Sequence, residues 1–92
     1  TGKTDYATDG KEILSCTGGS IKATLVVGTG CSLSAMVAAF VAQTEHPLEA
    51  VISACALAKR AAQQAAGVAR GPGSFAVAYI DALNLLQAKD FY

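Results

Sequence analysis

Residues 25–35 read LVVGTGCSLSA, and two different patterns meet inside this stretch. Its first three residues are apolar without polar alternation, which is typical of a strand covered on both faces. From Leu33 onward the apolar residues recur at helical spacing, and Gly28 and Gly30 lie between the two patterns. The stretch therefore predicts a buried strand that enters a glycine turn and then a helix.

The predicted helix has no strongly polar face. Its apolar stripe is Leu33, Met36, Val37, Phe40 and Val41, and its opposite side is Ala35, Ala38, Ala39 and Ala42. A helix that is apolar all round is usually buried. We therefore expect this helix to be central and buried in the fold.

The elements before the glycine turn read as β-structure. Strands at about 4–8 and 12–16 flank Asp9 and Gly10, a dipeptide that favours a type I′ hairpin turn. A second strand group, 23–27, follows the turn signal at Gly18 and Gly19.

Three helices are expected after the turn, at about 30–43, 47–66 and 74–88. Pro47 suits the first position of the second helix, and residues 71–73 break the chain before the third. The core stripe of the second helix is expected to be Leu48, Val51, Ile52 and Cys55, and its solvent side Lys59, Arg60, Gln63 and Gln64. In the third helix Phe75, Tyr79, Ala82, Leu83 and Leu86 share a face. The predicted fold class is α/β, with strands within about 4–27 followed by three helices, in one unit of residues 1–92.

The composition is that of an interior piece of a larger domain. The 92 residues are 52% hydrophobic and 15% charged, whereas soluble domains carry about 25% charged residues. The chain also opens with Thr1 and not with Met. We therefore expect it to be a fragment.

Charge and cysteine content exclude several classes of function. Seven basic and seven acidic residues give a net charge of zero without a basic stripe, so neither nucleic acid nor a membrane surface is an expected partner. Three cysteines without CxxC spacing argue against a disulfide framework or a zinc site. A reducing cytoplasm is the expected location.

The glycine turn is a candidate anion site. A strand that ends in such a turn presents free backbone amides and the positive end of a helix dipole at one place, which suits a phosphate. A tight turn without a ligand is the alternative. The stretch is neither a dinucleotide fingerprint, since a third glycine would fall at Leu33, nor a Walker loop, since no Lys follows.

Cys31 lies in the first turn of the expected helix, where the dipole and unpaired amides should lower the pKa of its thiol from about 8.5 toward neutrality. A thiolate at this place could take a proton from a substrate hydroxyl. Cys16 and Cys55 are interpreted as small buried hydrophobic residues.

Three ordered motifs resemble the hydroxyethylthiazole kinase family throughout the chain. They are TGxxDYxTDG from Thr1 to Gly10, VVGTGCSLSA at 26–35, and GPGSF at 71–75 followed by DAL at 81–83. The resemblance implies a ribokinase-like fold, of which this chain is the C-terminal third. Sugar kinases of that fold have an Asp base where this chain has Cys31.

The resemblance also implies the roles of individual residues. Gly28 contacts the alcohol of 4-methyl-5-(2-hydroxyethyl)thiazole, Cys31 removes its proton, and Thr1 contacts the nucleotide. The amides of Gly28, Thr29, Gly30 and Cys31 form an anion hole for the transferred γ-phosphate. ATP and Mg²⁺ are the implied cofactors, in a cytoplasmic homotrimer whose nucleotide-binding arginine and metal-proximal carboxylates precede Thr1.

Two alternatives remain open. One is a catalytically silent piece that needs a separate N-terminal chain. The other is a ribokinase-like kinase for another small heterocyclic alcohol, although Cys31 in place of Asp speaks against it. No metal ligand is expected in the chain, because Asp5, Asp9 and Asp81 are interpreted as solvated carboxylates and His46 as a surface residue. For residues 71–74 only a role in beginning a helix is assigned.

Overall fold

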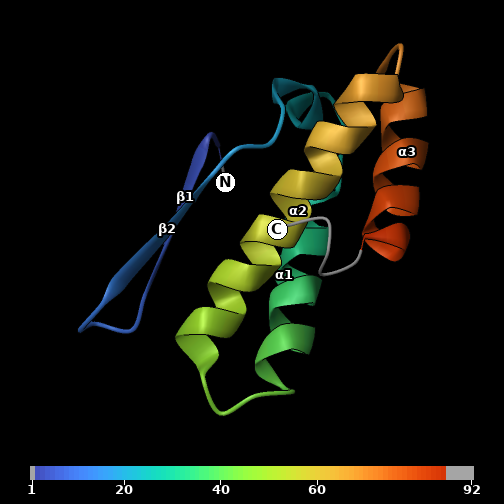
Figure 1. Ribbon diagram of the computed structural model, residues 1–92. Coiled ribbons are helices and arrows are strands. Elements are labelled where there is room, and N and C mark those ends of the chain that lie inside the picture. The colour runs from blue at the N-terminus through green and yellow to red at the C-terminus, as the bar shows by residue number, and fades with distance from the viewer. Residues whose placement is uncertain (1, 87–92) are drawn as a thin grey trace.

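The computed structural model describes residues 2–86, which form one hairpin, one 3₁₀-helix and three α-helices, with the long helix α2 at the centre. In chain order the elements are β1 (Thr4–Thr8), β2 (Ile13–Thr17), the 3₁₀-helix η1 (Ile21–Leu25), α1 (Thr29–Val41), α2 (Pro47–Val68) and α3 (Pro72–Leu85). The hairpin lies on one side of α2 and α3 on the other, with α1 alongside α2 (Figure 1). The predicted order of strands followed by three helices is confirmed.

The hairpin is antiparallel, and its register pairs Thr4 with Thr17 and Thr8 with Ile13. The first strand begins and ends as predicted, and the second is shifted by one residue. The turn is not type I′, because that turn needs positive φ at both central residues and in the loop only Gly10 has it, at 91°. Instead, Asp9 Oδ1 accepts the amides of Lys11 and Glu12, both at 2.9 Å. These hydrogen bonds, from Glu12 first and then Lys11, lower the pKa of Asp9 below 3.8.

The strand predicted at 23–27 is wrong, because the chain forms η1 there. Ser20 begins η1 by accepting the amide of Lys22 on its side-chain oxygen at 3.1 Å. The amide of Val26 donates to the carbonyl of Ala23 at 3.4 Å. Within residues 2–86 the sheet consists of β1 and β2, so this apolar run finds no strand beside it and bonds locally instead.

The core lies between α2 and α3. Alanines line the α2 side, which lets α3 approach closely, and Phe75 is fully buried against them. Phe75 and Tyr79 stack with ring centroids 5.9 Å apart. The predicted face of α3 is confirmed, since Leu83 and Leu86 pack against this core. The buried members are Ala61, Ala62, Ala65, Phe75, Tyr79 and Ala82.

The burial predicted for α1 and α2 needs correction. Within the described chain α1 has no buried residue, because it packs against α2 on one side and its alanine-rich side is uncovered. In α2 only Cys55 of the expected stripe is buried, while Leu48, Val51 and Ile52 are half-buried. Small residues such as Ala54 occupy the closest contacts instead. No helix within residues 2–86 is long and apolar enough to cross a membrane.

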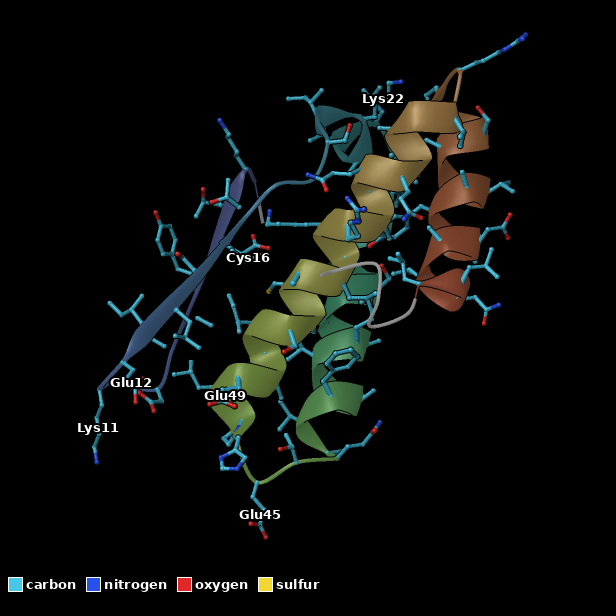
Figure 2. All side chains as sticks on the ribbon, viewed as in Figure 1. Lys11, Glu12, Cys16, Lys22, Glu45 and Glu49 are labelled. Atoms are coloured by element: carbon cyan, nitrogen blue, oxygen red, sulfur yellow. The ribbon has the colours of Figure 1, made fainter. Side chains whose placement is uncertain are left out.

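A lysine side chain caps the C-terminal end of α2. Lys22 Nζ donates to the carbonyls of Ala66 and Ala69, at 3.2 and 3.3 Å, where α2 runs out of amide partners. Figure 2 shows Lys22 beside this end of α2 and Cys16 on the hairpin. Lys22 thus attaches η1 to the end of α2, next to the start of α1.

Candidate functional site

The first turn of α1 presents three open amides. Gly28 precedes the helix in the left-handed region, with φ 100°. The amide of Ser32 donates to the carbonyl of Gly28 at 2.9 Å. The amides of Thr29, Gly30 and Cys31 precede this first bond and so have no acceptor within the helix. A Cβ on Gly28 would meet nothing within 4 Å, so glycine is needed here for its φ and not for space.

Side chains of α1 and α3 and a backbone carbonyl of η1 lie around this turn. Ser32 Oγ donates to the carbonyl of Thr29 at 2.9 Å, and Thr29 Oγ1 reaches the carbonyl of Ala23 in η1 at 3.4 Å. Burial raises the pKa of Tyr79 of α3 above its ordinary value, and an interaction with the Ser32 side chain partly opposes this rise. Sequence reasoning placed Tyr79 in the core and did not connect it to the turn. No local pattern reports a contact between α3 and the first turn of α1.

The three cysteines lie in different environments. Cys31 is exposed in the first turn of α1, Cys16 is half-buried on β2, and Cys55 is buried in α2. The prediction of a buried side chain is confirmed for Cys55 and only partly for Cys16. The thiol of Cys31 is free and open to a reactant that approaches the amides of this turn.

A cavity of about 720 Å³ joins the start of the hairpin to the first turn of α1. Gly2 and Lys3 line it at the hairpin, and Thr29 and Gly30 line it at α1. Thr1 lies outside the described residues, but its neighbour Gly2 belongs to the wall. Gly28 and Cys31 do not. The remaining lining residues are Asp5, Gly18, Gly19, Ser20, Ile21, Ala23, Thr24, Leu33, Ala58, Lys59, Ala62, Gln63 and Tyr79.

One wall of the cavity carries a buried ion pair that corrects two predictions. Asp5 was expected in solvent but is 6% exposed, and Lys59 was expected on the wet side of α2 but is 8% exposed. Lys59 Nζ lies 3.3 Å from Asp5 Oδ2. It also donates to the carbonyl of Gly2 at 2.7 Å. Strand β1 covers this part of α2, which removes both charges from water and pairs them.

Asp9, Asp81 and His46 lie on the surface, as predicted. Across residues 2–86 no group of three His, Cys, Asp or Glu side chains could hold a metal ion. Mg²⁺ prefers carboxylate and other oxygen ligands, and the carboxylate in the cavity wall is committed to Lys59. The described residues therefore do not form a Mg²⁺ site by themselves.

Residues 71–74 form the beginning of α3. Ser74 Oγ accepts the amides of Arg70 and Gly71, at 3.0 and 3.2 Å. Pro72 takes the first helical position, where its missing N–H is not needed. This loop therefore connects α2 to α3 and caps the start of α3.

The sequence profile of the hydroxyethylthiazole kinase family matches residues 1–89. The chain belongs to the hydroxyethylthiazole kinase family. It is 51% identical over 90 residues to a hydroxyethylthiazole kinase of Citrobacter koseri, which covers 98% of this chain and 34% of that protein. A hydroxyethylthiazole kinase of Leptospira interrogans is 43% identical over 89 residues, 97% of this chain and 34% of that protein.

The fold also matches part of a solved hydroxyethylthiazole kinase. The structure of the protein of this family from Pyrococcus horikoshii OT3 matches 99% of this chain with a TM-score of 0.93 at 38% identity, over 35% of that chain. The hairpin and three helices are thus part of an α/β kinase fold. The chain spans about a third of the length of the hydroxyethylthiazole kinases that it matches.

Proposed function

We propose that this chain is the C-terminal third of a kinase that transfers the γ-phosphoryl group of ATP to the hydroxyl of 4-methyl-5-(2-hydroxyethyl)thiazole. The observation that carries the proposal is the first turn of α1, where an exposed thiol and three open amides occur together. Gly2 and Lys3 line the other end of the cavity that reaches this turn, and Thr1, which lies outside the described residues, is the proposed nucleotide contact.

The chemistry assigned to this turn is proton removal and charge stabilisation. The Cys31 thiolate takes the proton of the substrate hydroxyl, whose oxygen then forms a bond to the γ-phosphorus of ATP. The bond between that phosphorus and the β–γ bridging oxygen breaks, and ADP leaves with the electron pair. Gly28 contacts the alcohol, and the amides from Gly28 to Cys31 donate to the phosphoryl oxygens, where preorganised donors are most effective.

Mg²⁺ neutralises phosphate charge in phosphoryl transfer generally, and we assign its ligands to residues outside 2–86. We place the enzyme in the cytoplasm, where free cysteines stay reduced. The alternative substrate is another small heterocyclic alcohol. Kinase assays with the two alcohols distinguish these possibilities.

Exposed apolar side chains support the proposal that the isolated 92-residue chain is catalytically inactive. Val27, next to the glycine turn, is fully exposed, and Ile21 is 84% exposed. Residues this apolar require a covering element. We therefore propose that the remainder of the kinase covers this side and completes the active site.

The test is a coupled assay of ADP release with the purified full-length kinase, ATP and the thiazole alcohol. We expect turnover with this alcohol and none with the isolated 92-residue chain, because phosphoryl transfer depends on several positioned groups. Absence of turnover by the full-length protein with this alcohol contradicts the proposed function. Turnover by the isolated chain shows instead that the site is complete within it.

A further inference from the structure

The 3₁₀-helix η1 connects the end of α2 to the first turn of α1 through two side chains. Lys22 Nζ donates to the carbonyls of Ala66 and Ala69 at 3.2 and 3.3 Å (Figure 2). From the other direction, Thr29 Oγ1 of α1 donates to the carbonyl of Ala23 in η1 at 3.4 Å. One side chain therefore attaches η1 to α2, and another attaches α1 to η1.

The end of α2 is built to accept Lys22. In a continued helix the amide of Arg70 would donate to the carbonyl of Ala66, four residues earlier. That amide donates instead to Ser74 Oγ at 3.0 Å, and Lys22 supplies a donor to Ala66 in its place. A cation is also favourable at the negative end of the helix dipole. Lys22 is thus a specific anchor for η1 at this end of α2.

The carbonyl of Ala23 is the junction between η1 and α1. It accepts both the hydroxyl of Thr29 and the amide of Val26, each at 3.4 Å, as the two lone pairs of a carbonyl oxygen allow. The side chains of Ala23 and Val26 pack against the core between α2 and α3, so the core fixes the backbone that accepts Thr29. Ala23, Thr29 and Gly30 all line the cavity. The junction therefore lies where the cavity meets the open amides.

The first turn of α1 gains little support from the residues just before it. Val27 is fully exposed, and a Cβ on Gly28 would meet nothing within 4 Å. Thr29 is held more firmly, because Ser32 Oγ donates to its carbonyl at 2.9 Å while its hydroxyl reaches η1. The peptide unit is planar, so fixing the Thr29 carbonyl also fixes the direction of the Gly30 amide. The hydrogen bonds of Thr29 thus control the aim of an open amide.

We propose that Lys22 and Thr29 are positioning residues for phosphoryl transfer: Lys22 holds η1 on α2, and the Thr29 hydroxyl holds the open amides of α1 against η1. The proposal rests on the proposed function, in which these amides stabilise the transferred γ-phosphate. Neither side chain is assigned a contact with the reacting atoms. Preorganised donors act on charge that develops in the transition state. Loss of either side chain should therefore lower kcat and leave ground-state binding unchanged.

The variants isolate one group at a time in the full-length kinase. Thr29→Val removes the hydroxyl and keeps the branched shape and the amide, whereas Thr29→Ser keeps the hydroxyl. Lys22→Met removes the ammonium group and keeps most of the length. The 3.4 Å bond of Thr29 is longer than the usual 2.5–3.0 Å of an O–H···O hydrogen bond. It contributes little to stability, so Thr29→Val is expected to fold normally.

Thr8 provides a matched control for the change from threonine to valine. Its Oγ1 donates to the carbonyl of Glu12 at 2.7 Å and accepts the amide of Gly10 at 3.0 Å. Thr8 lies at the turn of the hairpin and is not among the residues of 2–86 that line the cavity. Thr8→Val loses two shorter hydrogen bonds than the one of Thr29. It should therefore lower the melting temperature more than Thr29→Val does, with unchanged kcat.

Three measurements are made on each variant. Release of ADP gives kcat and the KM values for ATP and the thiazole alcohol. Calorimetry gives the Kd for ADP alone and for ADP with aluminium fluoride and Mg²⁺, in which the fluoride complex mimics the phosphoryl group in transfer. Thermal melting reports folding. The mimic measures the anion hole directly, because it requires no turnover.

We expect Thr29→Val to lower kcat by about tenfold to 10²-fold, as small misplacements of donors do. Binding of ADP with aluminium fluoride should weaken by a similar factor, while the Kd for ADP and both KM values stay unchanged. Thr29→Ser should be close to the wild type. Lys22→Met should show the same loss with a lower melting temperature. In the double variant Thr29→Val/Lys22→Met, kcat should fall no further than in the weaker single variant, because both residues act through η1.

Wild-type kcat and wild-type binding of the mimic in folded Thr29→Val or Lys22→Met overturn the proposal. A Thr29→Ser as impaired as Thr29→Val does so too, since the hydroxyl is then not the cause, and so do additive losses in the double variant. If the wild type binds the mimic but does not phosphorylate the thiazole alcohol, the proposed function fails, and binding of the mimic by Thr29→Val still decides the role of Thr29. A wild type that does not bind the mimic contradicts both proposals.

Discussion

The amide of Ser32 donates to the carbonyl of Gly28 at 2.9 Å, and this bond determines which amides of α1 remain open. Gly28 adopts φ 100° immediately before α1. Its carbonyl accepts the first hydrogen bond of the helix. The three amides that follow, together with that of Gly28, form the candidate anion hole.

Substitution of Gly28 and Gly30 distinguishes the effect of this turn on stability from its effect on kinase activity. In the full-length enzyme, Gly28→Ala should cost about 1–2 kcal/mol of stability, because a side chain disfavours the left-handed region. Gly30 lies within the helix and a Cβ there meets nothing within 4 Å, so Gly30→Ala should add about 0.5–1 kcal/mol of stability.

Activity should fall in both variants, since the new Cβ of Gly30→Ala stands where the phosphate approaches the amides and Gly28→Ala displaces them. A loss of about 10²-fold in kcat is expected, as for removal of one oxyanion donor. Chemical denaturation and steady-state kinetics are the measurements. If Gly30→Ala is more stable and fully active, the turn binds no phosphate.

Tyr79 gives a prediction about pH. Burial raises the pKa of its hydroxyl above 10.0 in the folded state. Above pH 10 the unfolded chain loses this proton more readily than the folded chain, so the free energy of unfolding falls as pH rises through this range. Tyr79→Phe removes this dependence together with the interaction between the Tyr79 hydroxyl and the Ser32 side chain, and the loss of a polar partner of this kind should cost about 1 kcal/mol near neutral pH.

The stability gap between wild type and Tyr79→Phe should therefore narrow as pH rises above 10. Denaturation curves at several pH values measure it. Tyr6→Phe is the control, because Tyr6 is 74% exposed and its replacement should leave the free energy of unfolding unchanged at neutral pH. A gap that stays constant from pH 8 to pH 11 contradicts this account of Tyr79.

The elements of the fold were predictable where the signal is local. Pro47 and Pro72 take the first positions of α2 and α3, and the apolar face from Phe75 to Leu86 is the one that packs. The sequence patterns failed at 23–27, where an apolar run predicts a strand but the described part of the chain, residues 2–86, offers it no neighbouring strand. Strand formation depends on a partner that the run itself does not encode.

The site was predictable only in part for the same reason. Residues 28–31 form one continuous turn, so their role in presenting amides follows from the glycine and helix patterns. Lys59 meets Asp5 and Gly2 from far along the chain, and its place between polar and small residues of α2 predicts exposure. Long-range pairing of this kind leaves no periodic signal.

We also propose that the full-length kinase is a homotrimer, as the resemblance to its family implies. Apolar side chains remain exposed on α3, where Val77 is 63% and Ile80 66% exposed. Residues of this kind are expected to be covered by other parts of the kinase or by neighbouring subunits. Sedimentation velocity should give the mass of three chains, and a fully active monomer contradicts the proposal.

Replacement of Cys31 tests the proposed mechanism directly. If the thiolate is the general base, Cys31→Ala and Cys31→Ser remove an effect that typically contributes about 10²- to 10⁴-fold. The loss should appear in kcat, while KM values change far less, because substrate binding is built mainly from other groups. Cys31 is exposed, so neither substitution leaves a cavity, and thermal melting should confirm unchanged folding.

Cys31→Asp should behave differently from both. A carboxylate is about the size of the thiol and is ionised at neutral pH, and it restores the base that sugar kinases of this fold use. Its negative charge near the γ-phosphate is unfavourable, but the amides and dipole at the start of α1 offset much of that repulsion. Activity should therefore be retained or raised. If Cys31→Ala keeps the wild-type kcat, or if folded Cys31→Asp is as inactive as Cys31→Ala, then Cys31 only packs the turn and the anion hole acts without it.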